Sequence, residues 1–235
     1  MTLYRLYLES GPKRQKTLVH VLDLLGCVAG GPTTEAALAS TPDAIGAYLR
    51  FLQRHGEVTD PEAEVETEVA EHITVGIWLG NGDPSLLFEP DRAPLTPEDL
   101  EGYIARLEWM RGELAALVGG LSEAQWDARP PKGRAIRAIV AHMLESEYAY
   151  MAAFGKLEGL PGPGAILTRR QGELLEWLAT VRAREIERLR GLSEAERSAA
   201  FVHWKYIRTA RKVVRRMLEH AWEHLVELQE RLLAR

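Results

Sequence analysis

Three histidines fall on the apolar stripes of predicted helices, at positions where leucine is the usual residue. In the segment RMLEHAWEHLVEL, His220 and His224 are four residues apart, so a helix places both side chains on one face, one turn apart. His142, in AHMLESE, has the corresponding inward position on an earlier helix. Helical zinc sites use this four-residue spacing, and a third imidazole completes the smallest usual ligand set. The pattern predicts a divalent metal held by His142, His220 and His224.

The alternative is that each imidazole is an ordinary core residue, since a histidine on an apolar face usually finds local partners for its nitrogens. An HxxxH pair also arises often by chance. A shared ion is favoured because three imidazoles buried in one layer all lose hydration and all need partners. The single cysteine, Cys27, excludes a cysteine-rich zinc cluster and is expected to be a small buried residue.

Three neutral imidazoles suit zinc, nickel, iron or cobalt, and they leave a coordination position open for water or substrate. Such an ion could generate hydroxide for hydrolysis, or it could ionise a low-molecular-weight thiol for transfer to an electrophile. The residues do not choose between the two, and they identify no further catalytic residue. No glycine-rich phosphate loop or serine-hydrolase elbow occurs in the sequence, which disfavours nucleotide-dependent chemistry and serine hydrolysis.

Charged residues near the three histidines have two interpretations each. Four glutamates could orient a ligating imidazole or lie on the surface: Glu145, Glu147, Glu219 and Glu223. Six basic residues could form a collar that attracts an anionic thiol or carboxylate, or a solvated basic face: Lys205, Arg208, Arg211, Lys212, Arg215 and Arg216. His203, in HWKY, could line the mouth of a pocket or pack beside Trp204.

Long helices are needed to position these residues, and the sequence after FEPDRAPLTP has a helical period throughout. Four helices are expected, at about 97–118, 133–154, 165–190 and 207–233, with turns at LSEAQWD, GLPGPG (159–164) and LSEAER. Thr96 caps the first of them. Because each helix has one apolar stripe that it cannot bury alone, the four should form a bundle.

The sequence before the proline-rich linker has a mixed pattern. Strands are expected at 3–9 and 17–23 as a hairpin, at 63–69, and at 73–79 as the start of a second hairpin. A helix capped at Thr33 or Thr34 should close at Gly56, with Pro42 kinking or dividing it. The fold class is therefore an α+β module over residues 1–90 followed by an all-α four-helix bundle over residues 91–235.

Composition limits the function classes. The chain has 235 residues, is 46% apolar and 27% charged, and has a net charge of −5. No apolar run is long enough for a membrane span and no signal peptide is evident, so we expect a cytoplasmic protein without a membrane partner. Neither half is strongly basic, which makes nucleic acid an unfavoured ligand.

Two resemblances add to this interpretation. LSEAQWDARPPKGRAIRAIVAHMLESE and LEHAWEHLVELQERL make residues 95–235 resemble the DinB-like superfamily of helical bundles, which includes thiol-dependent S-transferases and maleylpyruvate isomerase-type proteins. That resemblance implies a four-helix bundle, a homodimer and a divalent metal on His142, His220 and His224. The tryptophan that the family commonly has before the second helix is replaced by Gly133-Arg134-Ala135, and its usual glycine-glutamine by Val226-Glu227.

The second resemblance concerns the first half of the chain. The strand pair, Gly26-Cys27 and GGPTTEAALASTPDAIGAYL make residues 3–55 resemble the HicB-like antitoxin fold, which implies a module that holds a protein partner. Two hypotheses follow. The first is a metal-dependent S-transferase or hydrolase, with zinc, nickel or iron and a small-molecule thiol as its cofactor or substrate. The second is a non-catalytic interaction protein, in which the N-terminal module holds a partner and the bundle supplies a dimer surface.

Overall fold

The computed structural model describes residues 1–12, 15–155, 157, 171–203 and 205–233. By its internal contacts the chain divides into two compact units. Unit 1 comprises Met1–Pro94 and Ser198–Glu219, and unit 2 comprises Leu95–Arg197 and His220–Arg235. The units are not contiguous in sequence, because the chain returns to unit 1 after its first pass through unit 2. The division into a module of residues 1–90 and a bundle of residues 91–235 remains a prediction.

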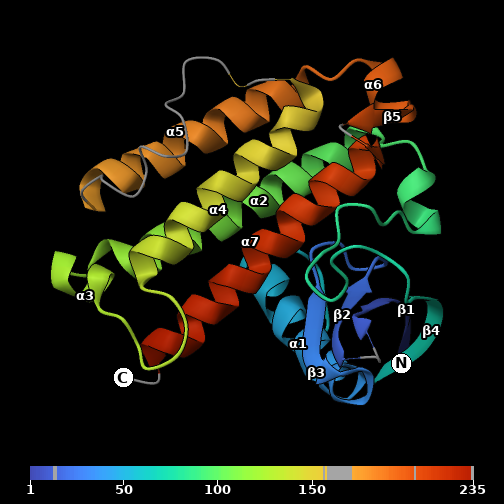
Figure 1. The fold of residues 1–235 in the computed structure, drawn as a ribbon, viewed down its shortest axis with the longest axis horizontal. Coiled ribbons are helices and arrows are strands. Elements are labelled where there is room, and N and C mark those ends of the chain that lie inside the picture. The colour runs from blue at the N-terminus through green and yellow to red at the C-terminus, as the bar shows by residue number, and fades with distance from the viewer. Residues whose placement is uncertain (13–14, 156, 158–170, 204, 234–235) are drawn as a thin grey trace. The chain divides into compact units, whose positions relative to one another are not determined.

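Unit 1 is built on a four-stranded sheet with the order β3-β2-β1-β4 (Figure 1). Its strands are β1 (Thr2–Ser10), β2 (Gln15–Val21), β3 (Val28–Thr33) and β4 (Val65–Ile73). The first three form an antiparallel meander, whereas β4 pairs in parallel with β1. The parallel pairing requires a crossover, which helix α1 (Thr34–Arg54) supplies. The predicted first hairpin, helix and strand at 63–69 are confirmed, whereas β3 was not expected.

Helix α1 covers one face of this sheet. Thr33 caps it by accepting a hydrogen bond from the backbone N–H of Ala36, and the helix runs through Pro42 without being divided. Its buried residues, among them Ala37, recur at helical spacing. The helix approaches β3 so closely that a Cβ on Gly31 would lie 2.5 Å from the Ala37 nitrogen. Glycine is therefore required at this strand position.

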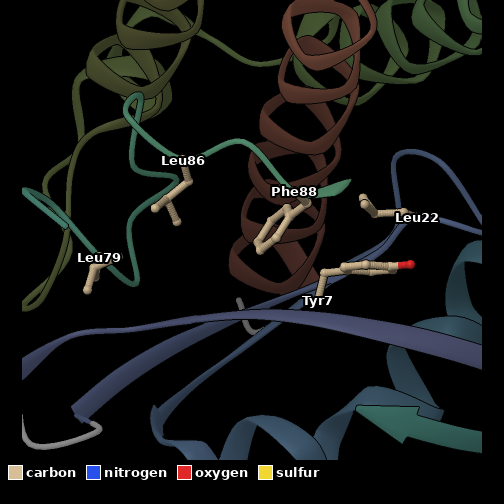
Figure 2. Close-up of a cluster of buried hydrophobic side chains, with 5 residues drawn as sticks. All are labelled: Tyr7, Leu22, Leu79, Leu86 and Phe88. Carbon is tan, nitrogen blue, oxygen red and sulfur yellow. The ribbon is translucent and has the colours of Figure 1, made fainter. Parts of the chain in front are cut away.

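The other face of the sheet carries the apolar cluster shown in Figure 2, which joins Tyr7, Leu22, Leu79, Leu86 and Phe88. The rings of Tyr7 and Phe88 are tilted against each other with centroids 5.6 Å apart. Three members of the cluster come from the segment after β4, which the sequence analysis expected to begin as a strand at 73–79. The segment thus contributes to the core without joining the sheet.

The expectation of a strand over 73–79 was wrong beyond Ile73, where β4 ends. Asp83 accounts for the difference. Its carboxylate accepts hydrogen bonds from the backbone N–H groups of Ile77, Trp78 and Ser85, so these donors are satisfied by a turn instead of a ladder. Two of the apolar residues that suggested a strand are left on the surface, since Ile77 is 65% and Trp78 60% exposed, whereas Leu79 is buried in the cluster.

Unit 2 is a helical bundle (Figure 1). Its elements are α2 (Pro97–Gly119), α3 (Glu123–Asp127), α4 (Ile136–Met151), η3 (Ala152–Phe154), α5 (Gln171–Arg190), α6 (Glu194–Ser198) and the last part of α7 (Ala210–Leu233). Thr96 caps α2 as predicted, with its side chain accepting from the Asp99 N–H. The predicted turn LSEAQWD contains α3, which begins with a capping box of Ser122 and Gln125. The predicted segments 159–164 and 165–170 lie outside the described residues.

The C-terminal part is not all-α, which corrects the predicted fold class. Residues expected to open the last helix at 207 instead form β6 (Tyr206–Thr209), paired antiparallel with β5 (Ala200–His203). Helix α7 therefore begins at Ala210. The β-branched and aromatic residues of AFVH and YIRT favour this hairpin over helix. Among the described residues, no helix combines the length and apolar character that crossing a membrane requires.

Candidate metal centre

The structure brings His142, His220 and His224 together inside unit 2. Helix α4 carries His142, and α7 carries the other two. The Nε2 atom of His220 lies 3.1 Å from Nε2 of His142 and 3.2 Å from Nε2 of His224. One ligand atom from each histidine lies within 4.8 Å of the others. The predicted convergence of three imidazoles is confirmed, although His142 lies 78 residues before His220 in the sequence.

The spacing fits a single divalent ion. Two nitrogens bound tetrahedrally to zinc at about 2.0–2.1 Å lie about 3.3 Å apart, close to the two Nε2 separations. Hydrogen bonding alone satisfies these atoms less well. A single Nε2 proton on a neutral His220 would have to be shared between His142 and His224, whereas an ion accepts a lone pair from all three.

Glu227 fixes the orientation of His224. Its Oε2 lies 2.8 Å from Nδ1 of His224, and a carboxylate can only accept, so Nδ1 carries the proton and Nε2 presents a lone pair to the cluster. The hydrogen bond from His224 holds the pKa of Glu227 below its usual value, and Arg134 and Arg231 add to this effect. Arg231 donates to Oε1 at 3.3 Å, and Arg134 lies 3.7 Å from Oε2.

His142 is the most exposed of the three imidazoles, since it is half-buried while His220 and His224 are buried. Burial lowers its pKa to about 4, and the nearby positive charge of Arg134 adds to the shift. His142 is therefore neutral at physiological pH, as a metal ligand must be. The ring of Tyr150, two turns along α4, lies edge-on to His220 with centroids 5.9 Å apart. It forms part of the wall of the cluster.

Neither Glu147 nor Glu219, two of the four glutamates considered for orienting the ligands, bonds to the cluster. Glu147 accepts from Arg111 and from Arg182, the latter at 2.9 Å. Glu219 accepts from His20 and Arg215 in unit 1. Glu227, three residues after His224 on the same helix, was missed. The i, i+3 spacing in the sequence was the available signal.

The predicted basic collar is also corrected. Lys212, Arg215 and Arg216 are buried within unit 1, so they form neither a solvated face nor an exposed collar. Arg215 pairs with Asp91, and Lys212 donates to the carbonyl oxygens of Pro84, at 2.8 Å, and Leu86. Burial, with help from nearby arginines, lowers the pKa of Lys212 to about 7. Both interpretations of these three residues were therefore wrong.

The remaining histidines lie elsewhere. His20 is buried in unit 1, and His72 bonds through Nε2 to the Ser10 hydroxyl at 2.7 Å. His55 packs against Phe51, and His203 lies in β5. Cys27 is buried as predicted, and burial raises the pKa of its thiol well above the usual value. None of these five side chains contributes to the three-histidine group.

The fold and the cluster together define a class of protein. It is a helical bundle that carries three convergent imidazoles on two of its helices. The chain belongs to the DinB superfamily, whose family model matches residues 106–228, just over half of the sequence. Among solved structures it is similar to YfiT from Bacillus subtilis, with 20% identity, a TM-score of 0.44, and coverage of 58% of this chain and 89% of that one. That structure is described as "a probable metal-dependent hydrolase with an unusual four-helix bundle topology". No curated protein matches the chain. The resemblance of the first half to HicB finds no support in these matches.

Proposed function

We propose that this protein is a metal-dependent enzyme whose divalent ion is held by His142, His220 and His224. The observation that carries the proposal is the convergence of the three Nε2 atoms, with neighbouring pairs 3.1 and 3.2 Å apart. Borderline nitrogen ligands suit zinc, nickel or iron. Three protein ligands leave a coordination position for a reactant, as in catalytic sites, whereas structural zinc sites are closed by four.

The chain's own residues prepare the site for such an ion. Glu227 holds His224 in the tautomer that directs Nε2 inward, a role for which carboxylates are common in metal sites. His142 stays neutral and half-buried, so the cluster has an accessible side. When bound, the ion supplies a Lewis acid that acidifies a water or thiol ligand near neutral pH. Hydrolysis and thiol transfer both follow from that chemistry, and we propose the site for one of the two.

Metal content tests the binding half of the proposal. Protein purified without a histidine tag should contain one equivalent of a divalent metal by mass spectrometry, and His142→Ala or His220→Ala should remove it. His203→Ala is the matched control, because His203 lies outside the cluster, and it should keep the metal. Zinc at about 100 times its Kd should stabilise the wild type by about 2.7 kcal/mol. A folded protein that binds no zinc, nickel or iron would refute the proposal.

Turnover tests the catalytic half. The metal-loaded wild type is assayed with activated esters and amides for hydrolysis, and with a low-molecular-weight thiol plus an electrophile for transfer. Activity that disappears in His220→Ala and persists in His203→Ala identifies the reaction type. Metal binding without either activity would leave a metal-stabilised protein and contradict the enzymatic proposal.

A second candidate function, as a partner-binding protein, is favoured by a surface feature of unit 1. The turn held by Asp83 exposes Val75, Ile77 and Trp78, which are 85%, 65% and 60% exposed. Rigidly held apolar residues of this kind are typical of protein contact sites. Association through this turn, including the expected homodimer, should fall when Trp78 is changed to Ser, as measured by light scattering. An unchanged mass would remove the turn from any such interface.

A further inference from the structure

A pocket of about 610 Å³ lies next to the histidine cluster in unit 2. One wall is the segment between α3 and α4, with Arg129 and Lys132, and the other is the end of α7, with Glu227 and Arg231. Glu227 belongs to both places, because it lines the pocket and accepts the hydrogen bond from His224. Glu227 therefore connects the pocket to the Nδ1 edge of His224, whose Nε2 belongs to the cluster. The volume of the pocket is in the range that small-molecule sites have, about 300–1,000 Å³.

Positive charge is in excess around this pocket. Arg129, Lys132 and Arg231 line it with two carboxylates, those of Glu227 and Glu230. The Glu227 carboxylate is already engaged by His224, Arg231 and Arg134. Within the described part of the chain, Arg129 and Lys132 make no hydrogen bond or ion pair. Two exposed cations that pair with no carboxylate among the described residues thus line a cavity of ligand size.

The wall that carries these cations is held in place by the chain itself. Arg231 donates through Nη1 to the carbonyl oxygen of Arg134. Gly133 has a φ of +95°, and a Cβ there would lie 2.7 Å from Nη2 of Arg231, so only glycine allows the contact without strain. Pro130 and Pro131 restrict the backbone just before it. The basic side chains therefore project from a preorganised segment.

We propose that this pocket binds the anionic end of a small organic substrate that carries two negative charges. Its reacting group would extend past Glu227 to the three-histidine centre. Guanidinium groups bind carboxylate and phosphate oxygens through paired hydrogen bonds, so both kinds of dianion fit the chemistry. The inference rests on the proposed function, since it names the substrate class of the same centre.

Calorimetric titration of the zinc-loaded, full-length protein at low salt tests the proposal. The probes are succinate, inorganic phosphate and the neutral succinamide. Succinate or phosphate should bind, the stronger of the two showing which anion the pocket prefers, and succinamide should not. Binding should weaken as salt is raised, because the attraction is electrostatic. Failure of both anions to bind at millimolar concentration, or equal binding of succinamide, would overturn the proposal.

Variants locate the binding. The double variant Arg129→Gln/Lys132→Gln should weaken anion binding at least tenfold while keeping the full metal content. The matched control removes two exposed arginines of the same unit, Arg184→Gln/Arg190→Gln, and should change the affinity less than twofold. An equal loss of anion affinity in both double variants would mean a general charge effect and would overturn the proposed binding site.

The histidine variants separate this inference from the proposed function. Anion binding should survive in His142→Ala, in which the metal is lost but the pocket is intact. Binding that disappears in His142→Ala and persists in Arg129→Gln/Lys132→Gln would place the anion on the metal, refuting the pocket while supporting the centre. Anion binding at the pocket in a protein that takes up no metal would refute the proposed function and leave the anion site standing.

Discussion

Each unit contains a cluster of buried charges, and the two clusters differ in how well their hydrogen bonds are satisfied. In unit 1, Arg215 bonds to Asp91 through Nε at 2.7 Å and Nη2 at 2.9 Å, and Nη1 lies 2.9 Å from both oxygens of Glu219. Glu219 accepts further bonds from Arg216 at 2.7 Å and His20 at 2.9 Å. Every oxygen of these two carboxylates therefore faces a donor.

The bundle cluster joins Arg111, Glu147, Arg182 and Glu185 across α2, α4 and α5. The contact from Arg182 Nη1 to Glu185 Oε2 is 2.8 Å long, but it is not aligned as a hydrogen bond. Both oxygens of Glu185 and one of Glu147 have no hydrogen-bond partner among the described residues. Charges are thus balanced in this cluster while hydrogen bonds are missing.

Burial is nearly equal in the two places, with the Glu219 side chain 1% and the Glu185 side chain 0% exposed. Their pKa values nevertheless move in opposite directions. Burial would raise the pKa of Glu219, but Arg215, His20 and Arg216 together lower it well below normal. Burial raises the pKa of Glu185 to about 8, because Arg182 and Arg111 do not offset the lost hydration. The charges around the two carboxylates differ: three cationic groups act on Glu219, whereas the like charge of Glu147 opposes Arg182 and Arg111 at Glu185.

The largest loss of folding stability is expected from Arg215→Met. It leaves Asp91 and Glu219 buried without their shared partner, and removing one member of a buried charge pair costs about 3–5 kcal/mol. Urea unfolding of the whole chain measures the loss. Arg92→Met is the control, because Arg92 is a 56% exposed arginine of the same unit, and it should change stability by less than about 0.5 kcal/mol. A similar small change for Arg215→Met would mean that the unit 1 cluster is not stabilising.

A smaller loss of folding stability, which depends on pH, is expected from His20→Gln. Burial would lower the pKa of His20, but Glu219 and a hydrogen bond to Glu9 outweigh burial and the repulsion by Arg215, and they raise it. A raised pKa stabilises the folded state fully below about 6.5, the unfolded value, and the gain disappears as pH rises through the folded value. The substitution should cost about 1.5–3 kcal/mol at pH 6, the contribution of a hydrogen bond to a charged group.

Denaturant unfolding at a series of pH values checks this prediction. The difference between His20→Gln and the wild type should shrink as pH is raised above 6.5. His55→Gln is the control, since His55 is a histidine of the same unit that lies outside the cluster, and its difference should stay flat. A cost for His20→Gln that grows with pH would show that His20 is neutral in the folded protein.

The two clusters also show where sequence patterns fail. The three-histidine centre was predictable because its spacing on α7 is local and the third histidine lies on another apolar stripe. The charges of Lys212, Arg215 and Arg216 resemble a solvated face, and nothing local shows that they are buried. Partners of Arg215 and Lys212 come from distant loops, such as Asp91, which is 124 residues from Arg215. Tertiary pairing at such separations has no periodic signature in a single sequence.

The boundaries of helices and strands were predicted well where the sequence shows a capping residue. They were predicted poorly where the backbone N–H groups bond to a partner that the pattern does not show. Thr33 and Thr96 begin their helices as expected. Asp83 replaced a strand by a turn, and the hairpin of β5 and β6 replaced the first turn of the last helix. In both cases several hydrogen-bonding arrangements fit the same apolar pattern, and some of its residues are exposed, such as Ile77 and Ile207.

The smallest change in folding stability is expected from Glu185→Gln, which also gives the sharpest contrast with the cluster of unit 1. A carboxyl group whose pKa is raised to about 8 stays protonated in the folded protein while the unfolded chain ionises above about 4.3, so stability falls as pH rises between these values. Glutamine cannot ionise. The variant should match the wild type within about 0.5 kcal/mol at pH 4. It should be the more stable of the two at pH 8, with a difference that grows as pH rises. Denaturant unfolding at both pH values measures the difference in stability. A variant less stable than the wild type at pH 8 would mean that Glu185 is ionised and effectively paired with Arg182.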